Sequence, residues 1–273
     1  MKTVHLKLSG QASPRKSLPG KKRFVKRRYL FLLFLFSLIL NILFTSCDND
    51  GYSLGDWWAD YAVVHKTDNE LFTLTTDQGA VLFPSASAIP SDYLKNNDRV
   101  LVNFTILGDA DSTSPYDYYV KVNDVYKILT KDILDYTPSV SDSLGNDPIF
   151  LNEIRVRNGF ITLDFFFGGS LGGPKHMVNM ARHPLLTPDK RIVLDFRHNA
   201  FGDPHSYNYR SLVAFPINNI IDASQDSVQL RVLYNGYEKE EKVDLTWRAK
   251  ENPMPKNVFL HQDQNLPDKN RLR

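Results

Sequence analysis

The chain has 273 residues, of which 42% are hydrophobic and 12% aromatic, enough to fill a sizeable core. The first 47 residues contain ten Lys and Arg and no acid, so the net charge of +2 conceals a charge of −8 on residues 48–273. An acidic body repels phosphate, which argues against a nucleic-acid partner, and a single cysteine excludes a disulfide scaffold.

Residues 1–46 have the organisation of a signal peptide. A basic block at 21–28 precedes an uncharged apolar run at 29–44, and an N-terminal extension of 20 residues comes before both. A helix of about 16 residues is roughly 24 Å long, shorter than the hydrocarbon core of about 30 Å. We therefore expect a cleaved signal peptide rather than a spanning helix.

The apolar run ends at Cys47, after Leu43, Phe44, Thr45 and Ser46. This segment resembles the lipoprotein signal of bacteria, in the relaxed form of Bacteroidetes. The resemblance implies cleavage between Ser46 and Cys47, and acylation of Cys47 with fatty acids such as palmitate. We predict a lipid anchor in the outer membrane, at its periplasmic face or at the cell surface, followed by a tether at residues 47–55.

Residues 56–136 contain short apolar runs that alternate with polar residues, and they lack a long amphipathic helix. A short helix is an option at residues 91–95. The predicted strands are residues 60–65, 71–75, 80–83, 99–107 and 116–129. Five short strands of this kind predict a small Greek-key barrel similar to the OB fold.

The polar stretch 137–147 is interpreted as a linker to a second domain at 148–250. Asn235 and Gly236 suit a type I′ turn between the last two strands of this domain. The predicted strands are residues 149–156, 160–167, 176–181, 191–198, 209–215, 228–234 and 237–247. Seven strands predict an immunoglobulin-like β-sandwich, so the fold class is all-β.

Residues 251–273 are rich in Pro, Asn, Asp and Lys and are predicted to be a disordered tail.

Several segments between residues 56 and 248 resemble the NigD-like family of Bacteroidetes lipoproteins. They are Trp57-Trp58, the strand at 118–122 that runs into 128–131, ITLDF at 161–165, RIVLDFRHN at 191–199, Gly202-Asp203 and SLVAF at 211–215. The resemblance implies an N-terminal OB domain and a C-terminal β-sandwich. The family is named after a bacteriocin locus, and it supplies no established activity and no catalytic residues.

Gly168-Gly169-Ser170-Leu171-Gly172 has the G-x-S-x-G spacing of a serine hydrolase. Asp195 or Asp203, and His198 or His205, are candidate partners for Ser170. The nucleophile elbow needs a helix directly after the serine, and Gly173-Pro174 prevents one. A glycine-rich loop of the sandwich is the favoured interpretation, and a serine esterase is the alternative.

Two loops offer candidate metal ligands: His198, Asp203 and His205 in the first, and Asp109, Asp111 and Asp117 in the second. The histidine spacing is not diagnostic of a transition-metal site. The acidic loop lacks the pattern of an EF-hand. We therefore predict no metal and no cofactor, with a metal hydrolase as the alternative.

Trp57, Trp58 and Tyr118 flank the entrance of the predicted barrel and are candidate ligand-binding residues. OB faces with stacked aromatic rings bind oligosaccharides as well as oligonucleotides. Since nucleic acid is excluded by charge, a glycan is the ligand that these rings suggest.

These features together predict a lipid-anchored cell-envelope protein that is not an enzyme and acts by binding. The expected partners are membrane lipid, through acylated Cys47, and a protein whose identity the sequence leaves open, either a bacteriocin-like toxin or a neighbouring component of the envelope. A glycan-binding module on the cell surface is the alternative from another class, followed by the serine esterase or metal hydrolase.

Overall fold

The computed structural model describes residues 51–66, 71–90, 92–222, 224–250 and 271–273. The predictions for the signal peptide, for lipidation at Cys47, for residues 47–50 of the tether and for residues 251–270 of the tail lie outside these ranges. Within them, no helix has the length and apolar character needed to cross a membrane.

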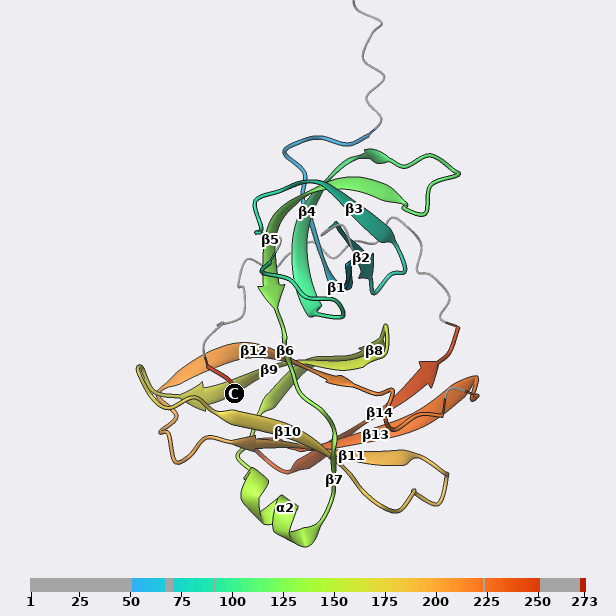
Figure 1. Cartoon of the computed structure of the whole chain (residues 1–273). Coiled ribbons are helices and arrows are strands. Elements are labelled where there is room, and N and C mark those ends of the chain that lie inside the picture. The colour runs from blue at the N-terminus through green and yellow to red at the C-terminus, as the bar shows by residue number, and fades with distance from the viewer. Residues whose placement is uncertain (1–50, 67–70, 91, 223, 251–270) are drawn as a thin grey trace, which may run out of the picture. The chain divides into compact units, whose positions relative to one another are not determined.

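The first domain is a closed barrel with the strand order β1-β2-β3-β5-β4 (Figure 1). Strands β3 and β5 pair in parallel and the other neighbours pair antiparallel. The strands are β1 (Trp58–Lys66), β2 (Phe72–Thr76), β3 (Val81–Ser87), β4 (Arg99–Asp109) and β5 (Tyr118–Lys127). Alternate residues of β4 point inward, and Val100, Val102 and Phe104 are fully buried. The predicted OB-like barrel is confirmed.

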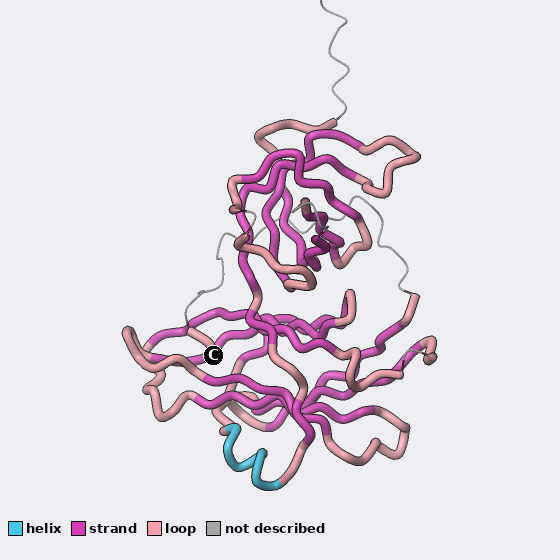
Figure 2. The backbone as a smooth tube through the Cα atoms, viewed as in Figure 1, coloured by secondary structure: helices cyan, strands magenta, loops and turns pink. Residues whose placement is uncertain are grey.

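The second domain is a sandwich of two sheets, with strand orders β14-β13-β11-β10-β7 and β6-β12-β9-β8. The strands are β6 (Leu129–Thr130), β7 (Leu134–Asp135), β8 (Phe150–Arg157), β9 (Phe160–Gly169), β10 (Met177–Arg182), β11 (Ile192–Asn199), β12 (Tyr207–Pro216), β13 (Ser227–Asn235) and β14 (Glu240–Arg248). Ile161, Leu163 and Phe165 of β9 belong to one apolar core with Val178 and Met180 of β10, in the other sheet. The predicted β-sandwich is confirmed, and strands predominate throughout (Figure 2).

The chain passes from the barrel to the sandwich before the polar stretch 137–147, which the sequence predicts to be the linker. Strand β6 pairs with β12 and β7 pairs with β10, so the chain enters the sandwich directly after Ile128. Residues 138–144 form helix α2 (Pro138–Leu144), with Thr137 accepting a hydrogen bond from Val140 N at its start. A strand of two residues is too short to show a periodic pattern, so β6 and β7 could not be predicted from the sequence. The optional helix at 91–95 is not present in the described residues 92–95.

The predicted type I′ turn at Asn235-Gly236 is wrong, because neither residue has a positive φ. Strands β13 and β14 are joined by residues 236–239, and Asn235 Nδ2 donates to Asn146 O at 2.7 Å. A turn of the predicted kind instead joins β8 to β9, where Asn158 and Gly159 have φ values of 49° and 78°.

Barrel and sandwich share a third cluster of buried side chains. Its members are Tyr61, Val63, Tyr126 and Ile128 from the barrel side and Phe160, Leu212 and Ala214 from the sandwich. Beside it, Arg99 is 1% exposed and donates two bonds of 2.6 Å to the carboxylate of Asp77. A buried charge needs such a partner. The guanidinium of Arg99 also lies over the rings of Tyr61 and Phe160, two members of this cluster from the two domains.

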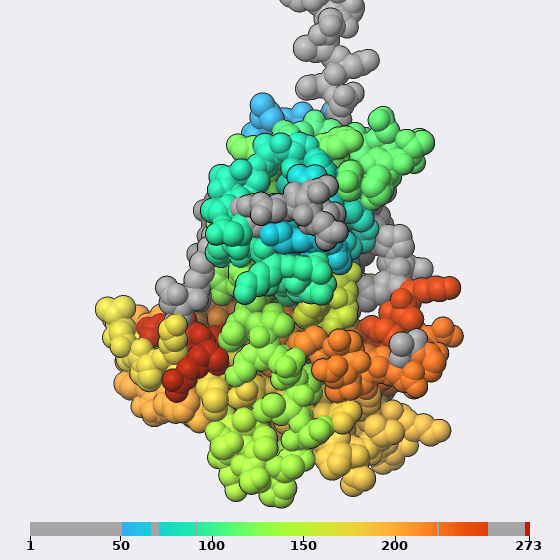
Figure 3. Space-filling view, in the orientation of Figure 1, coloured from blue at the N-terminus to red at the C-terminus, as the bar shows by residue number. Residues whose placement is uncertain are grey.

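Residues 271–273 lie beside the start of β10, where Leu272 pairs with His176, the residue directly before that strand, and Val178 N lies 3.4 Å from Arg273 O. Figure 3 shows them in dark red on the surface of the sandwich. The prediction of a disordered tail at residues 251–273 therefore does not hold for residues 271–273. Amino-acid composition does not reveal a contact made by three residues.

Candidate functional site

Three connections meet at one end of the sandwich. They are the β9–β10 loop (170–176), the β11–β12 loop (200–206) and the β13–β14 turn (236–239), and together we call them the three-loop surface. The register brings them together, because Gly169 pairs with Tyr207, Met177 with Asn199, and Phe196 with Tyr234.

A chain of polar side chains fixes two of these loops. Ser170 donates to Asp203 twice, through its backbone N at 3.0 Å and through its hydroxyl. His176 Nε2 lies 3.1 Å from Asp203 Oδ2, the oxygen that also accepts from Ser170 N, and His176 Nδ1 lies 2.9 Å from His198 Nε2. His176 and His198 are 1% and 3% exposed, and both rings pack on Phe167.

Burial and hydrogen bonds shift the pKa values of two groups in this chain. Burial, followed by the proximity of His176, lowers the pKa of His198 to about 4. Hydrogen bonds from Ser170 lower the pKa of Asp203 to about 2. At neutral pH His198 is therefore uncharged and Asp203 is a carboxylate.

The order of these groups differs from that of a serine hydrolase. In a catalytic triad an imidazole stands between the serine and the acid and takes the serine proton. Here Asp203 stands between Ser170 and His176, and a carboxylate with a pKa of about 2 is a weak base. His205, another candidate base, bonds to Asn208 at 2.8 Å. The geometry supports a structural role for Ser170.

The candidate metal ligands do not meet at one point. Of the histidine loop, His198 and Asp203 both contact His176, whereas His205 bonds to Asn208. In the acidic loop, Asp109 accepts from Tyr52 and Asp117 from Val81 N. Within the described ranges, no group of three His, Cys, Asp or Glu side chains is placed to hold a metal ion.

The glycine-rich run at 168–173 is explained by close packing. A Cβ on Gly173 would lie 2.3 Å from Asp203 Oδ2, and one on Gly168 would lie 2.2 Å from the ring of His205. These residues let the β9–β10 loop approach the β11–β12 loop closely enough for the Ser170–Asp203 contact.

Large apolar side chains project into solvent from these loops and from the first residue of β12. Leu171 is 82% exposed, Tyr207 57%, Tyr237 49% and Phe201 46%. The hydroxyl of Tyr237 accepts from Gly168 N at 3.1 Å, and the φ of Phe201 is 55° with Gly202 following at 78°. Exposed aromatic and aliphatic residues on rigid loops are typical of surfaces that bind proteins.

The aromatic candidates of the barrel lie in a different environment. Tyr118 is 5% exposed, and Trp58 is half-buried and stacks on Phe104 with 6.4 Å between ring centroids. Tyr52 contacts both of these rings edge-on. Trp58 and Tyr118 therefore pack with the barrel core, and Trp57 is half-buried beside them in sequence.

Sequence reasoning placed His198 and Asp203 in one candidate site but gave no role to His176, which joins them. It also gave no role to Phe201, Tyr207 and Tyr237. A local signal exists only for Phe201, which precedes Gly202 in a predicted loop. The other residues meet through the sheet order, which single-sequence patterns do not reveal.

Comparison with known proteins covers both domains. Residues 61–128 match the family model of the NigD-like N-terminal OB domain, and residues 132–247 match that of the NigD-like C-terminal beta sandwich domain. No curated protein matches the chain in sequence.

Several solved structures resemble this chain in fold. A candidate toxin-related protein from Parabacteroides distasonis is 32% identical with a TM-score of 0.61, and the match covers 71% of this chain and 94% of that one. A NigD-like immunity protein from Bacteroides caccae is 17% identical with a TM-score of 0.55, covering 70% and 97%. A candidate lipoprotein from Bacteroides fragilis is 14% identical with a TM-score of 0.50, covering 71% and 99%. The last two share the fold with this chain.

Proposed function

The chain belongs to the NigD-like family, and on this premise we propose that it is a lipid-anchored envelope protein that binds a protein toxin of the bacteriocin class. Three features support this proposal: the lipoprotein-like segment before Cys47, the charge of −8 on residues 48–273, and the names of the relatives, which include a toxin-related and an immunity protein. The proposed role is that of a non-enzymatic binding protein.

The observation that carries the proposal is the exposure of Leu171, Phe201, Tyr207 and Tyr237 on one end of the sandwich. Fully burying one such side chain contributes about 1.5–3 kcal/mol, and interface energies concentrate in a few residues of this kind. Because the buried chain from Ser170 to His198 holds the loops before binding, little conformational entropy is lost on association.

The lipid anchor at Cys47 gives the binding surface its location. A protein held at the outer membrane meets a toxin before the toxin reaches deeper targets, and two acyl chains keep it there. Both the anchor and the three-loop surface are therefore required for protection in this proposal.

The experiment measures the survival of a deletion strain that is complemented with different forms of the chain and exposed to bacteriocin-containing medium from related bacteria. We expect the wild type to protect, and the triple variant Leu171→Ser/Tyr207→Ser/Tyr237→Ser to lose at least ten-fold in survivors. The matched control is Leu185→Ser/Leu186→Ser, which removes side chains that are 78% and 57% exposed on the β10–β11 loop, outside the three-loop surface. Equal survival with the triple variant and the control would contradict the proposed surface.

A further inference from the structure

Residues 271–273 extend one sheet of the sandwich as a short parallel strand. His176 N donates to Arg271 O and Arg273 N donates to His176 O, both at 2.9 Å, and Val178 N lies 3.4 Å from Arg273 O. Strand β7 pairs with Ala181 and Arg182 further along the same strand. The edge of β10 is thus covered by two separate short segments.

The side chain of Arg271 is held by a specific set of acceptors. Its guanidinium donates to Gly173 O at 3.3 Å, to Ser170 O and to the hydroxyl of Tyr209. It also stacks on the ring of Tyr209 with its Cζ 3.9 Å from the ring centroid. Planar stacking combined with several carbonyl acceptors suits arginine better than lysine.

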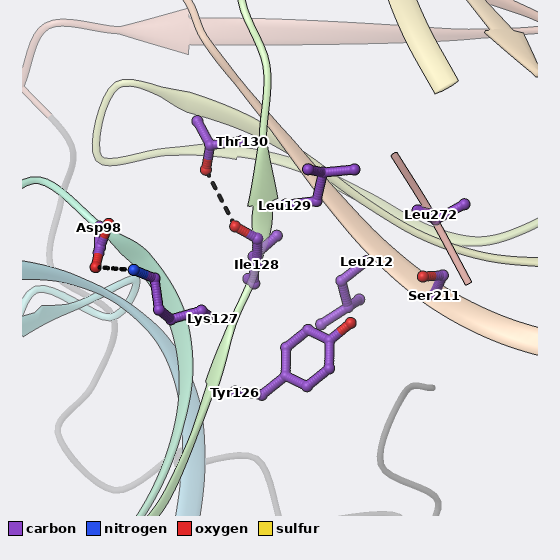
Figure 4. A pocket seen from close by; sticks show the side chains of 9 residues that line it. All are labelled: Asp98, Tyr126, Lys127, Ile128, Leu129, Thr130, Ser211, Leu212 and Leu272. Atoms are coloured by element: carbon purple, nitrogen blue, oxygen red, sulfur yellow. Dashed lines mark hydrogen bonds and ion pairs between the residues drawn. The ribbon is translucent and has the colours of Figure 1, made fainter. Parts of the chain in front are cut away.

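Leu272 forms part of the wall of a pocket of about 400 Å³. Leu129, Leu212 and Tyr126 contribute apolar surface to the same pocket (Figure 4). Asp98, Lys127, Thr130 and Ser211 add polar groups to the wall. Because Leu272 lines this space and does not fill it, the pocket has room for a larger side chain beside Leu272. Its volume is within the range of about 300–1,000 Å³ for ligand pockets.

Arg273 completes an alternating pattern, because its guanidinium lies over the ring of Phe201 with 4.6 Å from Cζ to the centroid. Three successive residues are therefore held in turn, by an arginine site, a pocket with both apolar and polar walls, and an aromatic ring. Such alternation of side-chain sites along a paired backbone is how sheet edges bind extended peptides.

We propose that the edge of β10 with its adjoining pocket is a strand-addition site for an extended basic–apolar–basic segment of a partner protein, and that residues 271–273 occupy this site until the partner displaces them. The partner segment runs parallel to β10, with its apolar residue opposite His176.

A partner strand can pair over a longer stretch than residues 271–273 do. Leu272 pairs with His176, and β7 begins its pairing at Ala181. Within the described ranges, Asn179 and Met180 have no register partner on this side of β10. A longer segment therefore adds backbone pairs, and a bulkier apolar residue fills the pocket, so such a segment has two advantages over the tethered residues.

The experiment uses the full chain, removes the side chains by which residues 271–273 hold the site, and measures the binding of peptides to it. The probes are the fluorescein-labelled peptides KNRLR, which has the sequence of residues 269–273, KNRFR and KNALA. Fluorescence anisotropy measures their binding to the wild type, to Arg271→Ala/Leu272→Ala, and to Lys121→Ala as an exposed control in the barrel. In the wild type, residues 271–273 compete with the peptides for the site.

We expect KNRLR to bind the double variant at least ten-fold more tightly than the wild type or Lys121→Ala, and KNRFR to bind more tightly still. Hydrogen exchange at the amides of His176 and Val178 rises in the double variant and falls again when KNRLR is added. If the double variant loses cooperative unfolding, Leu272→Ala alone replaces it.

Equal affinity of KNRLR for the wild type and the double variant, or equal binding of KNRLR and KNALA, would overturn the proposal. A wild-type dimer in which two copies exchange residues 271–273, detected by light scattering, would also overturn it by assigning the site to self-association. The peptides report on this site without a toxin, so their result is independent of the survival experiment.

Discussion

Arg99 of the barrel donates through Nε to Thr162 Oγ1 of the sandwich at 3.1 Å. Thr162 lies on β9 and is 2% exposed, so this bond joins the two domains in a region without access to water. The other donors of Arg99 hold Asp77, and Asn158 Nδ2 donates to the same carboxylate at 3.0 Å. The contact between the domains thus contains a satisfied polar network as well as apolar packing.

Replacing Arg99 with methionine leaves Asp77 as a buried carboxylate without its main partner. We expect Arg99→Met to lower the free energy of unfolding by about 3–5 kcal/mol, and to separate one urea transition into two. The measurement is urea unfolding followed by fluorescence and circular dichroism. The double variant Arg99→Met/Asp77→Leu removes both charges and should recover much of the loss, and no recovery would contradict the ion-pair explanation.

Because of Asp60, the stability of the same region depends on pH. Burial, followed by the charge of Asp77, raises the pKa of Asp60 to about 7 from an ordinary value of 3.8. Its Oδ2 has no hydrogen-bond partner among the described residues. The folded state therefore binds more protons than the unfolded state between these values, and stability from this group, fully present below about pH 4, is lost as the pH rises through 7.

Asp60→Asn should remove this loss. We expect the variant to gain about 2–4 kcal/mol over the wild type on going from pH 4 to pH 8, measured as the difference between their urea unfolding free energies. Asp92→Asn, at an exposed position, is the matched control and should change nothing across this range. Parallel profiles for wild type and Asp60→Asn would contradict the raised pKa.

Much of this fold is predictable from periodicity. Strands β4, β9 and β13 have 11, 10 and 9 residues, and their predicted limits fall within two residues of those observed. Strands β6 and β7 have two residues each and show no period. The boundary between the domains was misplaced for this reason, because the polar stretch was the only local signal available.

The candidate site was predictable only in part. Its glycine-rich loop and the pair His198 and Asp203 are visible in the sequence, because their residue types stand out locally. The approach of Tyr237 to Gly168 depends on which strands are neighbours in two sheets, over 69 positions of sequence. The pattern of apolar and polar residues within one segment does not predict contacts between residues so far apart in the sequence.

Gly173→Ala tests the close approach of the two loops. The added Cβ would lie 2.3 Å from Asp203 Oδ2, and that carboxylate is held by Ser170 and His176, so it moves only by losing hydrogen bonds. We expect a loss of about 1–3 kcal/mol, measured as a fall in Tm of roughly 2–4 °C for each kcal/mol. Gly108→Ala, where a Cβ meets nothing within 4 Å, is the control. A Tm equal to that of the control would contradict this packing.

Cys47→Ala should abolish membrane anchoring. The sequence predicts that the wild type begins at acylated Cys47, so its intact mass exceeds that of residues 47–273 by the lipid, and it partitions into detergent. We expect the variant to lose the lipid mass and to remain in the aqueous phase. A wild-type mass that retains residues 30–44 would instead indicate an uncleaved apolar segment.

Asp203→Asn addresses the rigidity of the three-loop surface. The carboxylate accepts from Ser170 N, Ser170 Oγ and His176, whereas an amide offers one oxygen and turns its NH₂ group toward a donor. We therefore expect faster hydrogen exchange at the amide of Ser170 in the variant. Because hydrogen bonds from Ser170 lower the pKa of Asp203 to about 2, the wild type keeps its protection at pH 4 and loses it only as the pH falls toward 2, while the variant shows no such step. If the exchange rates of the two proteins agree at pH 4, the carboxylate does not hold the loops, and the ordering of Leu171 and Phe201 must come from the backbone turns alone.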